Sequence, residues 1–84
     1  MPDIKSKHDM DRIKKHFEEV TDVWRLYRQY AGISNDPADD PKWDELVHVK
    51  AVEIQNRHGN TQFIRGLVMV VLELLECEAK EMSA

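Results

Sequence analysis

The sequence predicts an all-α protein, a three-helix bundle with a long first helix and a central, highly apolar third helix. Three observations support this prediction. Apolar residues recur at alternating steps of three and four between residues 10 and 31, which is the spacing of one helix face. Gly32 and Gly59 each follow a helical pattern, where a left-handed residue is expected. The stretch GLVMVVLELLE, residues 66–76, is apolar around most of a helix circumference.

The first helix is expected over residues 9–31. Its seam, the set of apolar positions that repeat at three- and four-residue steps, consists of Met10, Ile13, Phe17, Val20, Trp24, Tyr27 and Ala31. Ser6 or Asp9 can cap its start, and Gly32 can end it. A second apolar strip beside the seam consists of Val23, Leu26 and Tyr30. We expect the seam to face the core, which leaves the strip for another contact.

The second helix is expected over residues 41–58, after a turn rich in proline and aspartate. Asp40 is expected as its N-cap and Pro41 as its first residue, and a shorter turn over residues 37–39 can precede them. Its inner side is expected to carry Trp43, Leu46, Val47, Ala51 and Ile54. Gly59 can end this helix.

The third helix is expected over residues 61–81, capped by Asn60 or Thr61. On a helical wheel its polar residues occupy an arc of only about 80°, which also contains Met69, and apolar residues cover about 220°. A helix of this kind needs cover on more than one side. The run is nevertheless too short to span a membrane, which takes about 20 largely apolar residues.

The chain of 84 residues is expected to form one domain, with residues 1–6 and 82–84 flexible. A domain of this size hides only about 60–65% of the surface of its unfolded chain. The single cysteine, Cys77, cannot form an intrachain disulfide, and the N-terminus is charged where a signal peptide would be apolar. These features predict a cytoplasmic protein.

Six apolar side chains remain without cover in a bundle of three helices. They are Val23, Leu26, Tyr30, Val68, Met69 and Leu72. Burying them could contribute about 10 kcal/mol, against a total stability of about 5–15 kcal/mol for a small domain. We therefore expect a homodimer, or another protein partner, at this outer surface.

The charges suggest two further surfaces. Acidic residues in and after the turn form a candidate docking surface for a basic partner, although helix capping explains several of them; they are Asp36, Asp39, Asp40, Asp44 and Glu45. Basic residues of the first helix offer a competing role in nucleic-acid binding; they are Lys5, Lys7, Arg12, Lys14, Lys15, Arg25 and Arg28. The net charge of −4 makes binding to nucleic acid the less favoured alternative.

The sequence contains no complete constellation for catalysis, a metal or a cofactor. Glu45 and His48 have the E-x-x-H spacing of di-iron bundles, but no second copy of that motif exists. Cys77 falls on the apolar arc of the third helix, where we expect a core or interface thiol. The glycines are isolated, so no phosphate-binding loop is predicted. We expect a non-enzymatic protein without a cofactor or metal.

One resemblance concerns the order of aromatic and leucine motifs. Trp24-x-x-Tyr27-x-x-Tyr30 precedes an acidic proline-containing turn, Trp43-x-x-Leu46 follows it, and Phe63-x-x-x-Leu67 leads into the run from Val71 to Glu76. Over roughly residues 20–80 this order resembles small helical proteins of prophages and conjugative elements in Gram-positive bacteria. The resemblance implies an accessory or regulatory protein of a mobile element and carries no activity.

Overall fold

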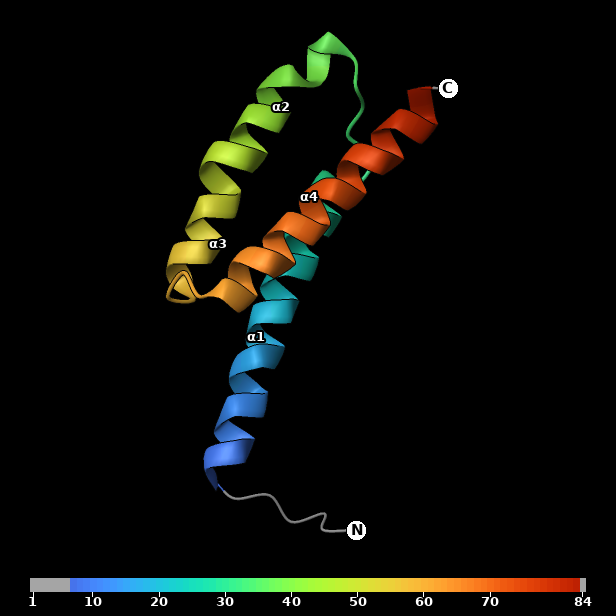
Figure 1. Ribbon diagram of the computed structural model, residues 1–84. Helices are drawn as coiled ribbons and strands as arrows, with labels where there is room; N and C mark the ends of the chain where they lie inside the picture. The colour runs from blue at the N-terminus through green and yellow to red at the C-terminus, as the bar shows by residue number, and fades with distance from the viewer. Residues whose placement is uncertain (1–6, 84) are drawn as a thin grey trace.

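The computed structural model describes residues 7–83, which are helical with no β-strand among them (Figure 1). The elements in chain order are α1 (Lys7–Tyr30), the 3₁₀ helix η1 (Pro37–Asp39), α2 (Asp40–Glu45), the π-helix η2 (Leu46–Lys50), α3 (Ala51–Arg57) and α4 (Gln62–Ser83). The predicted all-α class is confirmed. The expected Ser6 cap and the expected flexibility of residues 1–6 and 84 lie outside the described residues, and α4 continues two positions beyond its expected end.

Helix α1 ends where the sequence predicts a stop. Gly32 has φ +89°, in the left-handed region that favours glycine. The N–H of Ile33 donates to the carbonyl of Tyr30 at 3.0 Å, which closes the last turn. Asp9, one of the two expected caps, instead lies within the first turn, and its carboxylate accepts a hydrogen bond from Arg12.

Aspartate side chains stabilise the connection from α1 to α2 by hydrogen bonds. Asp36 Oδ1 accepts the N–H of Ala38 at 2.9 Å and so caps η1, the short turn expected here. Asp39 Oδ2 accepts both the backbone N–H and the hydroxyl of Ser34, each at 2.9 Å, and these bonds hold the pKa of Asp39 below its usual value. The predicted Asp40 cap is wrong. Asp39 holds the N-cap position without a capping bond, because Ser34 already uses its carboxylate, and Asp40 is the first helical residue.

The α2, η2 and α3 segments follow one another without a break and form one helical rod (Figure 1). Its middle is a π-helix, in which the N–H of Ala51 donates to the carbonyl of Leu46, five residues earlier. Leu46 and Ala51, at the two ends of this wide turn, are both buried, as is Ile54. Trp43 is only half-buried, and Val47 remains 39% exposed, so the expected inner position of Val47 is wrong.

A tight turn separates the rod from α4. Gly59 has φ +77° and Asn60 has φ +53°, both left-handed. Thr61 Oγ1 then accepts the N–H of Ile64 at 3.3 Å, so Thr61 rather than Asn60 acts as the cap. None of the helices within residues 7–83 combines the length and the apolar character needed to cross a membrane.

Helices α1 and α4 run in the same direction, and the rod formed by α2, η2 and α3 returns in the opposite direction (Figure 1). The N-terminal part of α1 extends beyond the other helices, and residues 10–18 are all exposed. We call this part the arm. The molecule is accordingly elongated, with principal extents of 51 × 27 × 18 Å.

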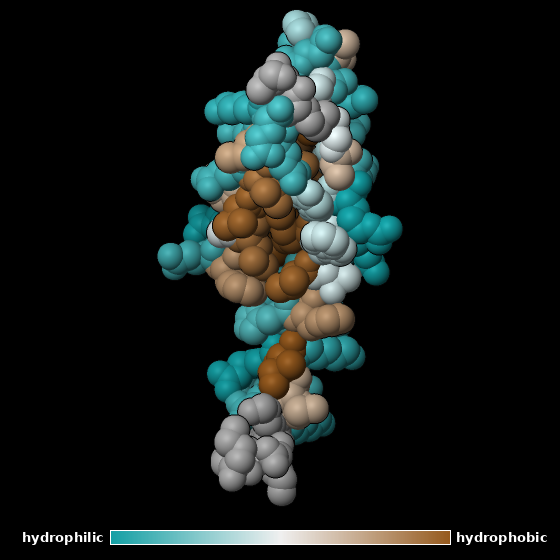
Figure 2. All heavy atoms as spheres, turned by 90° about the vertical axis from the view of Figure 1, so that its right-hand side faces the viewer, coloured by the Kyte–Doolittle hydropathy of each residue, from teal (hydrophilic) through white to brown (hydrophobic). Residues whose placement is uncertain are grey.

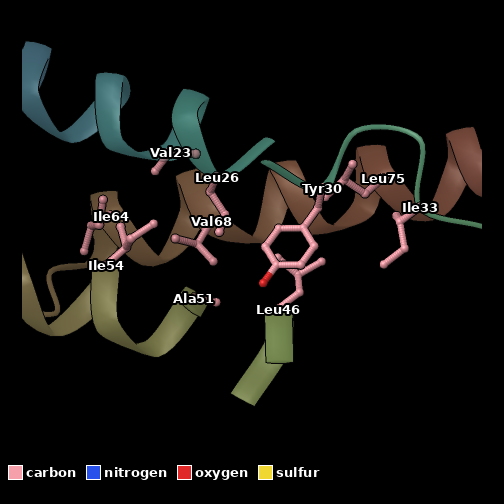
Figure 3. Close-up of a cluster of buried hydrophobic side chains, with 10 residues drawn as sticks. All are labelled: Val23, Leu26, Tyr30, Ile33, Leu46, Ala51, Ile54, Ile64, Val68 and Leu75. Atoms are coloured by element: carbon pink, nitrogen blue, oxygen red, sulfur yellow. The ribbon is translucent and has the colours of Figure 1, made fainter. Parts of the chain in front are cut away.

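The core lies between α1, α4 and the rod (Figure 3). Its buried apolar residues are Val23, Leu26, Tyr30, Ile33, Leu46, Ala51, Ile54, Ile64, Val68, Leu75 and Ala79. The expectation that Val23, Leu26, Tyr30 and Val68 lie on an outer surface is therefore wrong. Each of them is at most 6% exposed in the single chain, because this face of α1, rather than the seam, packs against the rod and α4.

One carboxylate is buried with this core. Glu19 on α1 is 0% exposed, and its Oε1 lies 2.6 Å from Nδ1 of His16. Its Oε2 has no hydrogen-bond partner among the described residues. A buried oxygen without a partner lowers stability, because it has lost its water without gaining another donor.

Candidate protein-interaction surface

Helix α1 presents its seam to solvent. Met10, Ile13, Phe17, Val20 and Trp24 are 47–69% exposed, and Phe17 is the most exposed of them. This placement reverses the sequence-based expectation that the seam packs in the core. The seam and the buried strip are neighbouring faces of one helix, so periodicity alone cannot distinguish which of them turns inward.

Polar contacts fix the rotation of α1. Asp22, the residue before Val23, accepts a hydrogen bond from Arg57 at 3.2 Å, and its Oδ2 lies 2.7 Å from Nε2 of His58. The Tyr30 hydroxyl donates to Glu45 of α2. Both contacts reach the rod from the side of α1 that carries the strip, and they therefore turn the strip inward and the seam outward.

These two contacts also shift pKa values. Partial burial tends to raise the pKa of Asp22, but hydrogen bonds from His58 and Arg57 outweigh it and leave the pKa lowered. Burial, together with the hydrogen bond to Glu45, raises the pKa of Tyr30 to about 12. The contacts are therefore strongest when Asp22 is ionised and Tyr30 is neutral.

Helix α4 carries a second exposed apolar stripe. Phe63, Val70 and Leu74 are 44%, 62% and 42% exposed, and Leu67 between them is half-buried. Cys77 continues the stripe and is exposed, so it does not belong to the core of the single chain. These five residues step by four, three, four and three, which places them on one side of the helix.

The two stripes lie side by side on one face of the molecule. The rings of His16 and Phe63 meet edge to face at 5.0 Å, and the Tyr27 hydroxyl donates to Glu78 at 2.9 Å. Trp24 stacks on Tyr27 at 5.3 Å within this region. Figure 2 shows the result, a continuous brown and pale surface that runs down into the arm. We call the eight exposed apolar residues the apolar face; they are Met10, Ile13, Phe17, Val20, Trp24, Phe63, Val70 and Leu74.

Charged side chains border the apolar face on both sides, seen as teal in Figure 2. On the α1 side, Lys7, Lys14 and Arg28 recur every seven or fourteen residues next to the seam. On the α4 side, Glu73 and Lys80 occupy the corresponding border. We refer to these borders as the α1 rim and the α4 rim. The α1 rim is basic, whereas the α4 rim carries one acidic residue, Glu73, and one basic residue, Lys80.

The remaining partner-binding candidates of α4 fall elsewhere. Met69 is 55% exposed but shares its side of the helix with Arg65, Glu73 and Glu76, outside the apolar face. Leu72 is half-buried against the core. Of the six side chains expected at the outer surface, only Met69 is exposed, and none belongs to the apolar face.

The acidic docking candidates do not form one continuous free surface. Asp36 caps η1, Asp39 binds Ser34 and lies 3.4 Å from the Lys42 ammonium, and Glu45 accepts the Tyr30 hydroxyl. Asp40 is exposed, and Asp44 is largely exposed with His48 at 3.6 Å. Three of the five carboxylates thus have structural partners, which agrees with the capping alternative for part of this set.

The candidates for chemistry are not brought together. In the E-x-x-H pair, Glu45 accepts the Tyr30 hydroxyl, whereas the ring of His48 lies 3.6 Å from the Asp44 carboxylate. Among residues 7–83 no group of three or more histidine, cysteine or acidic side chains is placed to hold a metal ion.

Two of the basic residues proposed for nucleic-acid binding already have acidic neighbours within α1. Arg12 pairs with Asp9, and Arg25 lies 3.6 Å from Asp22. Lys5 lies outside the described residues. The exposed cations that remain are spread along the arm and the α1 rim and do not form a single cluster.

Sequence reasoning recognised the seam as a unit but placed it in the core, and it missed the stripe on α4 as a separate face. A usable signal was present. Lys14 and Arg28 border the seam, whereas Asp22 lies next to the strip and can be neutralised by a cation from another helix. Comparison of the chain with family models, curated proteins and solved structures gave no match.

Proposed function

We propose that this chain is a non-enzymatic protein-protein interaction module that forms a homodimer through the apolar face of α1 and α4. The observation that carries the proposal is the exposure of eight large apolar side chains, each 42–69% accessible, on adjoining sides of two helices. In this proposal the chain is a three-helix bundle whose apolar α4 becomes central only when a partner covers its second side.

The size of the face supports a protein partner. With on the order of 200 Å² for each fully exposed large apolar residue, these exposed fractions correspond to on the order of 850 Å² of accessible surface per copy. A typical monomer exposes a largest apolar patch of about 300–600 Å², whereas a standard interface buries about 800 Å² on each partner. The face therefore has the area of an interface.

The shape and chemistry of the face also favour a helical partner. Phe17, Trp24 and Phe63 supply large rings, the kind of side chain that dominates binding energy at interface centres. The stripes step by three and four, so they match the spacing of another pair of helices. A second copy of the chain provides such a pair.

The α4 rim disfavours anionic partners. Glu73 lies beside the face, and Glu81 is exposed further along the same helix. Nucleic acid and anionic lipid surfaces would meet these carboxylates as soon as they approached the apolar residues. The resemblance noted in the sequence is consistent with an accessory or regulatory role in a mobile element, exercised through protein contacts.

A pair of neighbouring substitutions tests the proposal. Val70 and Met69 are 62% and 55% exposed, but only Val70 lies on the apolar face. Val70→Lys should convert the dimer to monomer in size-exclusion chromatography with light scattering, whereas Met69→Lys should leave the dimer intact. If both variants have the mass of the parent protein, the apolar face is not the interface.

A further inference from the structure

We propose that the two copies associate in parallel about a two-fold axis that runs along the helices, so that α1 of each copy packs against α4 of the other. Four helices pointing the same way then surround one apolar centre. This inference rests on the self-association proposed above, and it adds which helices meet and in which direction.

The register follows from contacts within one copy. His16 meets Phe63, 47 residues later, and Tyr27 bonds to Glu78, 51 residues later. These are contacts of long side chains that reach forward along α4. The buried side chains show the level of the two helices, because in the core Val23 lies beside Ile64 and Leu26 beside Val68 (Figure 3). A residue of α1 therefore lies level with the α4 residue a little more than 40 positions further along the chain. A two-fold axis parallel to the helices leaves the level of every residue unchanged, so the same relation holds between α1 of one copy and α4 of the other.

The apolar positions of α1 and α4 match at this offset. Four pairs of apolar residues differ by 43 in number and would form successive layers: Val20 with Phe63, Trp24 with Leu67, Tyr27 with Val70, and Ala31 with Leu74. Both helices step by four and three in the same order along these pairs. Parallel helices with such a common pattern pack their core residues layer by layer.

The rims complement each other in the same arrangement. The α1 rim of one copy lies against the α4 rim of the other, because the rotation exchanges the two sides of the face. Arg28 and Glu73 are both exposed, and no ion pair occupies either of them within the described residues. Glu73 lies about two residues after the α4 position level with Arg28, roughly 3 Å along the helix axis, within reach of two long side chains. Two symmetric ion pairs result.

The antiparallel alternative brings like charges together. A two-fold axis perpendicular to the helices would place α1 against α1, and the basic rim with Lys7, Lys14 and Arg28 would then face its own copy in reverse. Like charges across an interface oppose association. Charge thus favours the parallel dimer.

Mixing two charge variants distinguishes the arrangements. Arg28→Glu and Glu73→Arg each place like charges across both symmetric contacts of a parallel homodimer, and each should dimerise roughly tenfold more weakly at low salt. Mixed one to one, they restore opposite charges at both contacts. Native mass spectrometry should then show the mixed dimer at roughly ten times its statistical share.

A matched mixture serves as the control. Lys15→Glu and Glu76→Arg make the same charge changes on helix sides that face away from the apolar face, and they should mix at the statistical ratio. Tighter self-association of Arg28→Glu would overturn the parallel arrangement and indicate that α1 meets α1. A statistical ratio for Arg28→Glu with Glu73→Arg would also overturn it, whereas a monomeric parent protein would overturn the proposed function itself. Far-ultraviolet circular dichroism of each variant confirms that it is folded.

Discussion

Tyr27 of α1 donates its hydroxyl to both carboxylate oxygens of Glu78 on α4, each at 2.9 Å, across 51 residues of sequence. This contact joins the two helices near the C-terminal end of α4, as the ring contact of His16 with Phe63 does at the N-terminal end of α4. Together these two contacts fix the position of α4 along the axis of α1. The layers of the proposed dimer depend on this register.

Removal of the Tyr27 hydroxyl should therefore loosen the C-terminal half of α4. Tyr27→Phe keeps the ring that stacks on Trp24 but leaves Glu78 without its donor. We expect faster amide hydrogen exchange in the C-terminal half of α4 than in the parent protein, with little change near Phe63. Equal protection of both halves in the variant and the parent would show that the hydrogen bond does not set the register.

Core and face residues of α1 should respond differently to truncation. Leu26→Ala removes a side chain that is 3% exposed and should cost about 2–5 kcal/mol in the free energy of unfolding. Phe17→Ala, at 69% exposure, should change the stability of the monomer by no more than about 0.5 kcal/mol. Urea unfolding at low and high protein concentration separates the two effects, because only the loss at Phe17 should grow with concentration. A large, concentration-independent loss at Phe17 would contradict the outward placement of the seam.

Acid should weaken the contact between α1 and α3. The pKa of Asp22 is lowered, with hydrogen bonds from His58 and Arg57 outweighing the effect of burial. The stabilisation from a carboxyl whose folded-state pKa is depressed is present above its unfolded value of 3.8 and is lost as pH falls through the lower folded-state value. Asp22→Asn should cost about 1–3 kcal/mol at pH 7. Its stability should change less than that of the parent protein below about pH 4, as measured by urea unfolding at each pH.

High pH should destabilise the fold through ionisation of Tyr30. Its folded-state pKa of about 12 lies above the usual value of 10.0, so the unfolded chain loses this proton first as pH rises. Stability should therefore be fully present below pH 10 and decline between about pH 10 and pH 12. The absorbance of tyrosinate should appear late in a titration of the folded protein, since the pKa of Tyr27 is also raised by its bond to Glu78. Ionisation of both tyrosines at pH 10 would contradict the two hydrogen bonds.

The buried carboxylate of Glu19 should be replaceable with a gain. Its Oε2 has no donor, and an apolar side chain of similar length would avoid that loss. We expect Glu19→Met to raise the free energy of unfolding by roughly 1–2 kcal/mol, measured by urea denaturation at pH 7. His16→Ala is the companion variant, because it removes the partner of Oε1 and should lower stability. Destabilisation by Glu19→Met would show that Oε2 is satisfied in solution.

The all-α class, the number of long helical segments and the helix stops could be predicted because they depend on local residues. Gly32 and Gly59 need φ > 0, and the three- and four-residue steps need a helix. The π-turn at Leu46 to Lys50 could not be predicted, since no residue there requires it. Tertiary packing decides such irregularities.

The rotation of α1 was the decisive element that sequence reasoning predicted wrongly. The seam is the longer and more aromatic face, so the sequence alone favours its burial. The structure instead buries Leu26 and Tyr30, where Asp22 and the tyrosine hydroxyl find partners on the rod. Those partners come from residues more than a dozen positions away, so α1 alone offers only the weak signal of Asp22 beside the strip and cations beside the seam.

The most direct measurement is sedimentation equilibrium of the unmodified chain over about 1–100 μM, a range in which a reversible dimer changes its population. Self-association through the apolar face predicts an average mass that rises with concentration from the 9.9 kDa of one chain toward twice that value. A mass that stays at 9.9 kDa across the whole range would contradict it.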